Sequence, residues 1–142
     1  MNKQNKNIMT QENKELLFKD LCARWSYGVK VNNEIQGDFV IYGICGNYIF
    51  ARTSTGHVDF QIEKIKPYLF PMSSMTDKQK EEYDILRDSV PTYHYEFGDV
   101  MVDDTKLCDN WESIDYLNAH HFDYRGLIEK GLAIDATNLN IY

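Results

Sequence analysis

Four short segments typical of β-strands lie between residues 29 and 62, and turn residues separate each of them from the next. In the clearest one, HVDFQI at residues 57–62, apolar and polar side chains alternate, which indicates a strand with one face in the core. Gly46-Asn47 stands between two apolar runs and is typical of a two-residue hairpin link. Short strands joined by tight turns predict an antiparallel sheet, which constrains this chain more than any other feature does.

The pattern leaves open how this sheet ends. Residues 39–45, FVIYGIC, are nearly all apolar, so both faces of that strand are expected to be covered. The segment IEKIKPYL is expected to form a single turn and then a strand that closes a small SH3-like barrel. The alternative is an open sheet covered by the first helix. Pro67 and Pro71 are expected to bracket a rigid connector.

Capping residues predict two helices outside the C-terminal region. Thr10 is a good N-cap for a helix over residues 11–24, whose one apolar stripe indicates one buried side. That stripe is formed by Leu17, Phe18, Leu21 and Cys22. Thr76 and Gln79 form a capping box for a helix that runs to about residue 87. Its apolar stripe is formed by Tyr83, Ile85 and Leu86.

The segment from residue 110 onward predicts a pair of short helices. Asn110 caps the first helix, and the second is expected over residues 123–130. The stripe of the first is formed by Trp111, Ile114, Leu117 and His121. Gly131 then stands where a left-handed residue is needed, so that Leu132 can fold back on Leu127 in a Schellman closure. The residues expected in the core here are Leu127, Ile128, Leu132 and Ile134.

Together these elements predict an α+β fold. Its parts are a small antiparallel sheet or SH3-like barrel, an N-terminal helix, a middle helix, a hairpin and a C-terminal helical pair. A chain of 142 residues suits one domain. Residues 1–9 are expected to be disordered, and residues 10–142 to form the domain. Its β-rich part is residues 29–70, and its helical part, with an acidic hairpin, is residues 76–142.

Three segments of the chain resemble one family of sequences. They are LLFKDLCAR followed by YGVKV, KPYLFPMSSMT with QKEEY, and DYLNAHHFDYRGLIEKGLAIDAT. They are similar to small uncharacterised proteins from gut Bacteroidetes, their phages and mobile elements, and they span nearly the whole chain from Met9. Residues 88–110 fit that pattern least well. The resemblance implies a phage or mobile-element setting and brings no catalytic or binding residues with it.

Composition narrows the class of protein. The three cysteines are odd in number and form no C-x-x-C pair, which favours free thiols in a reducing cytosol. No apolar run approaches the length of about 18 residues that a membrane span requires. The N-terminus has no apolar segment typical of a signal peptide. We therefore expect a cytoplasmic protein that does not enter a membrane.

Acidic residues are concentrated in one part of the chain. Residues 1–80 carry a net charge of +3, whereas residues 81–123 carry −10. The block includes a predicted hairpin, TYHYEFGDVMV, with its turn at Gly98-Asp99. An aromatic face beside clustered carboxylates suits a basic protein partner, while a core hairpin with a solvated acidic loop is the alternative. The candidate partner-binding residues are Tyr93, Tyr95, Glu96, Asp99, Asp103, Asp104 and Asp109.

Motifs that carry chemistry are absent from the sequence. It has no P-loop, no G-x-G-x-x-G and no G-x-S-x-G. Asp103, Asp104, Asp109 and Glu112 lack the spacing of a calcium loop. His120 and His121 point about 100° apart on a helix, so one of them is expected to be partly buried and the other solvated. We predict no catalytic residues, no metal site and no cofactor.

The leading hypothesis is a small cytoplasmic phage or mobile-element protein that acts by binding another protein. In its sharpest form it inhibits a host defence nuclease, with carboxylates that mimic phosphates in a basic groove. One alternative is a nucleic-acid-binding SH3-like barrel, in which Arg52, Lys64 and Lys66 would accompany aromatic residues, although the acidic block disfavours a nucleic-acid partner. Those aromatic residues are Tyr42, Tyr48 and Phe50. A structural homo-oligomer that buries its tyrosines is the third hypothesis.

Overall fold

The computed structural model describes the chain from residue 9 to residue 142, apart from the side chains of residues 89–96, 99 and 102–106. The segment predicted to be disordered, residues 1–9, lies outside the described residues except for Met9. The chain divides into two compact units. The first consists of Met1–Ser74 together with His121–Tyr142, and the second of Met75–His120.

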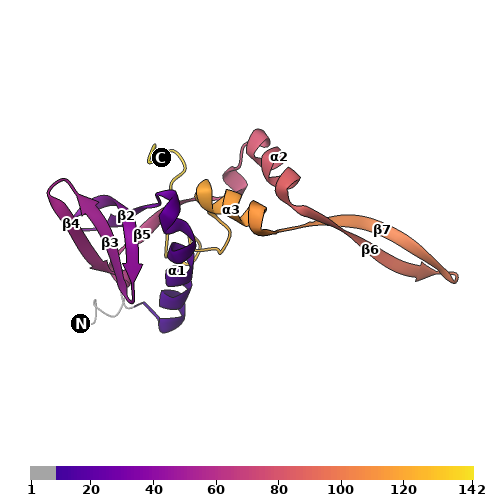
Figure 1. The fold of residues 1–142 in the computed structure, drawn as a ribbon, viewed down its shortest axis with the longest axis horizontal. Coiled ribbons are helices and arrows are strands. Elements are labelled where there is room, and N and C mark those ends of the chain that lie inside the picture. The colour runs from indigo at the N-terminus through magenta and orange to yellow at the C-terminus, as the bar shows by residue number, and fades with distance from the viewer. Residues whose placement is uncertain (1–8) are drawn as a thin grey trace. The chain divides into compact units, whose positions relative to one another are not determined.

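The first unit is built on a mixed sheet covered by one helix, α1 (Gln11–Arg24) (Figure 1). Its strands are β1 (Lys30–Asn33), β2 (Gly37–Cys45), β3 (Tyr48–Thr53), β4 (Gly56–Gln61), β5 (Lys66–Pro71), β8 (Phe122–Asp123) and β9 (Ile134–Asp135). The order is β4-β3-β2-β1-β5-β8, with β9 also paired to β5. The described strands form an open sheet and do not close into a barrel. The predicted α+β class is confirmed, with the open sheet as its form.

Strand β5 lies between β1 on one side and β8 and β9 on the other. The turn and the strand predicted in IEKIKPYL are confirmed, because a 3-10 turn at Ile62–Lys64 leads into β5. The rigid connector predicted between Pro67 and Pro71 falls within that strand. Pro67 pairs with Val31 of β1, and the next two residues, Tyr68 and Leu69, are buried. The other edge of β5 pairs in parallel with β8 and β9, which the sequence did not indicate. The connector prediction was wrong because proline is tolerated near the start of a strand. The free energy gained by burying Tyr68 and Leu69 then outweighs the hydrogen bond that Pro67 cannot donate.

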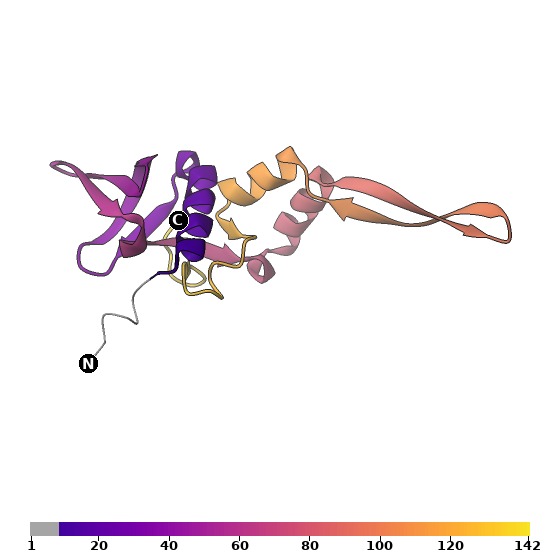
Figure 2. The same ribbon diagram turned by 90° about the horizontal axis from the view of Figure 1, so that it is seen from below.

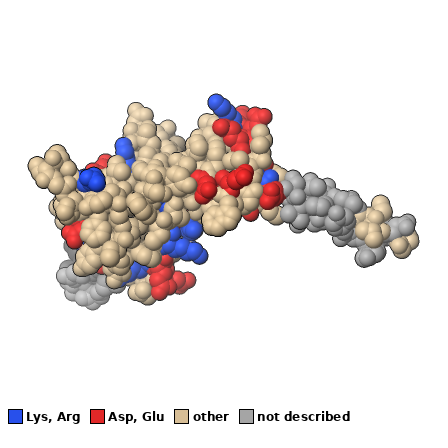
Figure 3. All heavy atoms as spheres, in the orientation of Figure 1, with Lys and Arg blue, Asp and Glu red and all other residues tan. Residues whose placement is uncertain are grey.

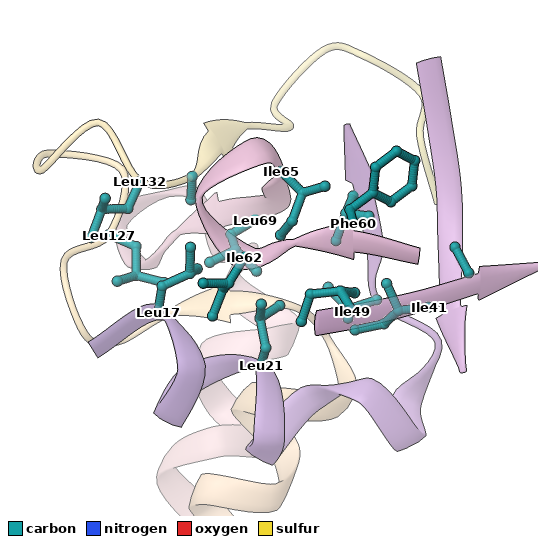
Figure 4. Close-up of a cluster of buried hydrophobic side chains, with 14 residues drawn as sticks. Leu17, Leu21, Ile41, Ile49, Phe60, Ile62, Ile65, Leu69, Leu127 and Leu132 are labelled. Carbon is teal, nitrogen blue, oxygen red and sulfur yellow. The ribbon is translucent and has the colours of Figure 1, made fainter. Parts of the chain in front are cut away.

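The core of the first unit lies between α1 and one face of the sheet. Leu17 and Leu21 of α1 pack with side chains from β2, β3, β4 and the C-terminal segment (Figure 4). Phe18 and Cys22, predicted in the same stripe, are exposed. The expectation that β2 is covered on both faces was also wrong, since Ile41 is its only fully buried residue. A single helix covers only one face of this part of the sheet.

Two charged residues in α1 are buried, which the helical pattern did not reveal. Arg24 donates from Nε to Asp20 at 2.8 Å and from Nη2 to the carbonyl of Phe122 at 2.6 Å. Arg125 Nη1 donates to the other carboxylate oxygen of Asp20 at 3.0 Å. Neither Asp20 nor Arg24 has exposed side-chain surface. This network ties α1 to the chain at β8.

The C-terminal segment forms one hydrogen-bonded turn where the second helix of a pair was expected. The N–H of Leu132 donates to the carbonyl of Leu127, and that of Gly131 donates to the carbonyl of Ile128. With Gly131 at φ +73°, this is the predicted Schellman closure. Asp123 accepts from the N–H groups of Leu127 and Ile128, so its carboxylate caps the turn. Asp123, where the helix was expected to begin, belongs to strand β8.

The second unit consists of two helices and a hairpin (Figure 2). They are α2 (Asp77–Leu86), β6 (Asp88–Glu96), β7 (Asp99–Cys108) and α3 (Trp111–Ala119). Both predicted N-caps are confirmed, because Thr76 and Asn110 each form a capping box. Tyr83 and Leu117 are buried as expected. Trp111 and Ile85, predicted on the apolar stripes, are 84% and 74% exposed. In these two short helices, fewer of the apolar residues are buried than the spacing of those residues in the sequence suggests.

Candidate functional site

The longest pairing in the chain is the hairpin β6–β7, whose strands pair only with each other among the described strands. It extends from the pair Asp88↔Cys108 to the pair Glu96↔Asp99. The prediction placed its turn at Gly98-Asp99, but the turn residues are Phe97 and Gly98. Both have positive φ, of 51° and 86°, which is the backbone of the two-residue turn that suits the twist of a hairpin.

The tip of this hairpin carries exposed apolar side chains. Phe97 is 98% exposed, and Val100 and Met101 at the start of β7 are 55% and 43% exposed. A phenylalanine in the left-handed region is uncommon, because glycine, asparagine or aspartate adopts that conformation at lower cost. A bulky apolar side chain in the turn therefore has a conformational cost and gains no burial within the chain. We call Phe97, Val100 and Met101 the apolar tip.

The other end of the hairpin is fixed to α2 and α3 by polar contacts. The hydroxyl of Tyr83 donates to Asp109 at 2.5 Å, and Arg87 Nε lies 3.7 Å from the same carboxylate. Arg87 also donates to the carbonyl of Leu107 at 3.0 Å, and Asn110 donates to that of Leu86 at 2.8 Å. These contacts hold both strands where they leave the helices. We call Tyr83, Arg87, Asp109 and Asn110 the root clamp.

Burial and the root clamp both raise the pKa of Tyr83. Burial first, and then the hydrogen bond to Asp109, raise the pKa of Tyr83 to about 12. The pKa of Tyr116 on α3 is also raised, by burial and by the nearby Glu82 carboxylate. Each hydroxyl donates to a carboxylate, that of Tyr83 to Asp109 and that of Tyr116 to Glu82 at 3.4 Å.

Acidic side chains surround the helices of this unit. Residues 75–120 contain 12 Asp or Glu and 4 Lys or Arg, a net charge of −8. Figure 3 shows acidic atoms gathered over α2 and α3. A shallow groove of about 490 Å³ lies along α2, with Ile85 and Leu107 as its apolar lining. Asp77, Lys80, Glu81 and Asp84 complete its lining.

The predicted partner-binding residues occupy different places in this unit. The side chains of Tyr93, Tyr95, Glu96, Asp99, Asp103 and Asp104 lie outside the described residues. The backbone register sets Tyr93 opposite Val102 and Tyr95 opposite Val100. Asp109 lies in the root clamp, engaged with Tyr83, Ser113 and Arg87, so it positions the hairpin. The apolar tip was missed because the turn was predicted one residue later, at Gly98-Asp99, which left Phe97 in the preceding strand.

The two adjacent histidines belong to different units. His120 is exposed and stacks on Tyr116 with ring centroids 4.1 Å apart. His121 is buried and stacks on Tyr142 at 3.8 Å and an interplanar angle of 13°. This division into one buried and one solvated histidine is as predicted. Among the residues with described side chains, no three His, Cys, Asp or Glu converge as metal ligands would.

Comparison with protein-family models, with curated proteins and with solved structures finds no significant match to this chain. The resemblance to small proteins of gut Bacteroidetes and their phages therefore stays a prediction. In the described part of the chain, no helix has the length and apolar character to cross a bilayer. Cys22, Cys45 and Cys108 are all free and exposed.

Proposed function

We propose that this chain is a non-catalytic interaction protein whose second unit binds a basic protein partner through the hairpin β6–β7. The observation that carries the proposal is the exposed apolar tip on a hairpin whose strands pair only with each other among the described strands. Two strands alone are marginally stable in water, and exposed apolar groups at their end add nothing to that stability. A partner that buries Phe97 accounts for both features.

Charge supports a basic partner in particular. The unit has a net charge of −8, whereas the remainder of the chain has a net charge of +1. Concentrated negative charge speeds the encounter with a positive surface, and a buried apolar anchor then slows dissociation. The same charge repels a second copy of the unit, which disfavours an oligomer held together by hairpins.

The narrower form of the proposal concerns the kind of basic partner. A protein that handles nucleic acid presents a groove lined with Lys and Arg, and carboxylates can occupy phosphate positions there. Glu96, Asp99, Asp103 and Asp104 are the hairpin carboxylates that would do so. In the phage or mobile-element setting that the resemblance implies, a host defence nuclease is the partner that we infer.

The test is to capture a partner and then measure its affinity for matched variants. Tagged chain is incubated with lysate of a gut Bacteroidetes species, and the partner is identified and purified for titration calorimetry. Phe97→Ser is expected to weaken binding by about 30-fold or more, as loss of an anchor does. Ile35→Ser is the control, since Ile35 is 92% exposed in a turn of the first unit. Its affinity is expected to be unchanged.

Charge reversal gives a second reading. Asp103→Lys with Asp104→Lys is expected to slow association at low salt, whereas Glu12→Lys with Glu15→Lys on α1 is expected to leave it unchanged. Equal affinity for the wild type, Phe97→Ser and the hairpin charge reversal would refute the proposal. A partner with an acidic binding surface would also refute it.

A further inference from the structure

In strands β2, β3 and β4, the sheet face opposite the core carries aromatic and basic side chains at alternate positions. Along β3, Ile49 and Ala51 are buried, so Tyr48, Phe50 and Arg52 share the opposite face. Tyr48 and Arg52 are exposed, and Phe50 is half-buried. This strand lies between β2 and β4, so its outward side chains lie in the middle of a three-stranded surface.

The neighbouring strands extend this surface. The guanidinium of Arg52 lies 4.7 Å from the ring centroid of Tyr42, and the rings of Tyr42 and Phe50 are 6.4 Å apart. His57 meets the edge of the Tyr42 ring at 6.4 Å and pairs with Arg52 across the strands. We call Tyr42, Tyr48, Phe50, Arg52 and His57 the stacking face.

A glycine leaves Phe50 open to a flat ligand. Gly43 is its direct partner on β2, and a Cβ at Gly43 would lie 3.8 Å from the Phe50 ring. Any larger side chain there would pack on that ring and occupy the space beside it. The absence of one leaves a π surface next to a cation, in a unit whose net charge is +1.

We propose that the stacking face binds single-stranded nucleic acid, independently of the hairpin. Bases stack on exposed aromatic rings whatever their sequence, and Arg52 and His57 supply partners for phosphate or for a base. Lys66 is exposed and is also directed to this face of the sheet, since its neighbour in sequence, Pro67, is buried. Lys30 lies on the same face, but its ammonium donates to the carbonyl of Ile141 at 2.6 Å, so we do not count it among the phosphate partners.

Two acidic residues lie on the same face, and their effects on a bound polyanion are expected to differ. Asp38 accepts hydrogen bonds from Tyr68 and Asn32, which stabilise its charge and lower its pKa. Asp59 is exposed directly opposite Phe50 and repels phosphate. Binding is therefore expected to be weak, sensitive to salt and limited by Asp59.

The experiment measures fluorescence anisotropy of a labelled oligouridine of about twelve nucleotides, a length within the span of one binding surface. The full chain is titrated at about 50 mM and about 200 mM salt. Phe50→Ala is expected to weaken binding about tenfold, and Phe18→Ala, which removes an exposed aromatic ring from α1, is expected to leave it unchanged. Arg52→Gln is expected to reduce the salt slope by about one, whereas Lys19→Gln on α1 is expected to do so by much less.

Two further variants separate stacking from general charge. Gly43→Val covers the Phe50 ring without removing any group, and we expect it to weaken binding by about the same factor as Phe50→Ala. Asp59→Asn is expected to strengthen binding about threefold, because it removes a nearby negative charge. Urea unfolding of each variant confirms that it folds.

Absence of binding at low salt would overturn the proposal. So would binding that Phe50→Ala and Gly43→Val leave unchanged, since the oligonucleotide would then lie elsewhere on the chain. Protection of the stacking face by a protein partner but not by oligouridine would likewise overturn it. Loss of the Phe97-dependent partner has no bearing on this result, because the two surfaces belong to different units.

Discussion

Replacing Arg24 with methionine tests the buried network of the first unit. The substitution keeps an unbranched side chain of similar length and removes the charge. It deletes the hydrogen bond to Asp20 at 2.8 Å and the one to the Phe122 carbonyl at 2.6 Å. Asp20 is then left fully buried with Arg125 as its remaining cation.

The expected cost follows from these contacts. Breaking a buried ion pair by removing one partner costs about 3–5 kcal/mol, because the other charge stays buried without full compensation. Arg125 still pairs with Asp20 at 3.0 Å, which puts the estimate at about 3 kcal/mol, the lower end of that range. Asp20→Asn removes the partner of two arginines and is expected to cost about 4 kcal/mol. Each value is a large part of the stability of a small domain, about 5–15 kcal/mol.

Combining Arg24→Met with Asp20→Asn tests whether the two charges are energetically coupled. With both charges removed, no uncompensated charge remains at Arg24 or Asp20, so the combined loss is expected to fall about 2 kcal/mol short of the sum. Urea unfolding is followed by the fluorescence of Trp25, next to Arg24, in a Trp111→Phe background. The two tryptophans lie in different units, so this signal reports on the first unit alone. Additivity within about 0.5 kcal/mol would refute the reasoning.

Three further outcomes follow from the structure. The pKa of Tyr83 is raised to about 12, so its contribution to the free energy of unfolding is fully present below its ordinary pKa of 10.0 and is lost as pH rises through about 12. Unfolding followed by Trp111 fluorescence should show this loss of stability, and Tyr83→Phe should abolish the pH dependence. Gly131→Ala is expected to lower the free energy of unfolding by about 1 kcal/mol, because φ of +73° strains an alanine, whereas a fully helical turn would gain stability from the change. Asn110→Ala removes a capping box and an anchor of the root clamp and should cost about 1–2 kcal/mol by the same urea assay, and an unchanged midpoint would contradict the role assigned to it.

Local signals in the sequence predicted much of the secondary structure. The helix from Gln11 to Arg24 has the predicted bounds, and Thr10 caps it by accepting from the N–H of Asn13. Alternation placed β4 correctly, and Gly131 marked the Schellman closure. Each of these depends on residues that are neighbours in the chain, so a short window of sequence contains the physical cause.

Features decided by distant residues were not predictable in this way. Strands β8 and β9 have two residues each, too few for any periodicity, and they exist because β5 offers them an edge. Burial of Arg24 depends on a carbonyl at Phe122, 98 residues away. The hairpin is longer than predicted because Pro91 does not interrupt it. A register irregularity between Pro91 and Tyr93 marks the place where the missing N–H is tolerated.

The chain leaves the first unit and returns to it at neighbouring points of one strand. Phe70 of β5 donates its N–H to the carbonyl of His121, and Phe70 pairs with Phe122. The second unit is thus inserted between two positions that are already held together, in the manner of a domain insertion. A short loop could replace the second unit without disturbing the sheet, and other structural units could be inserted at the same place. Under the function that we propose, the binding surface could be exchanged as one inserted segment while the first unit keeps its sequence.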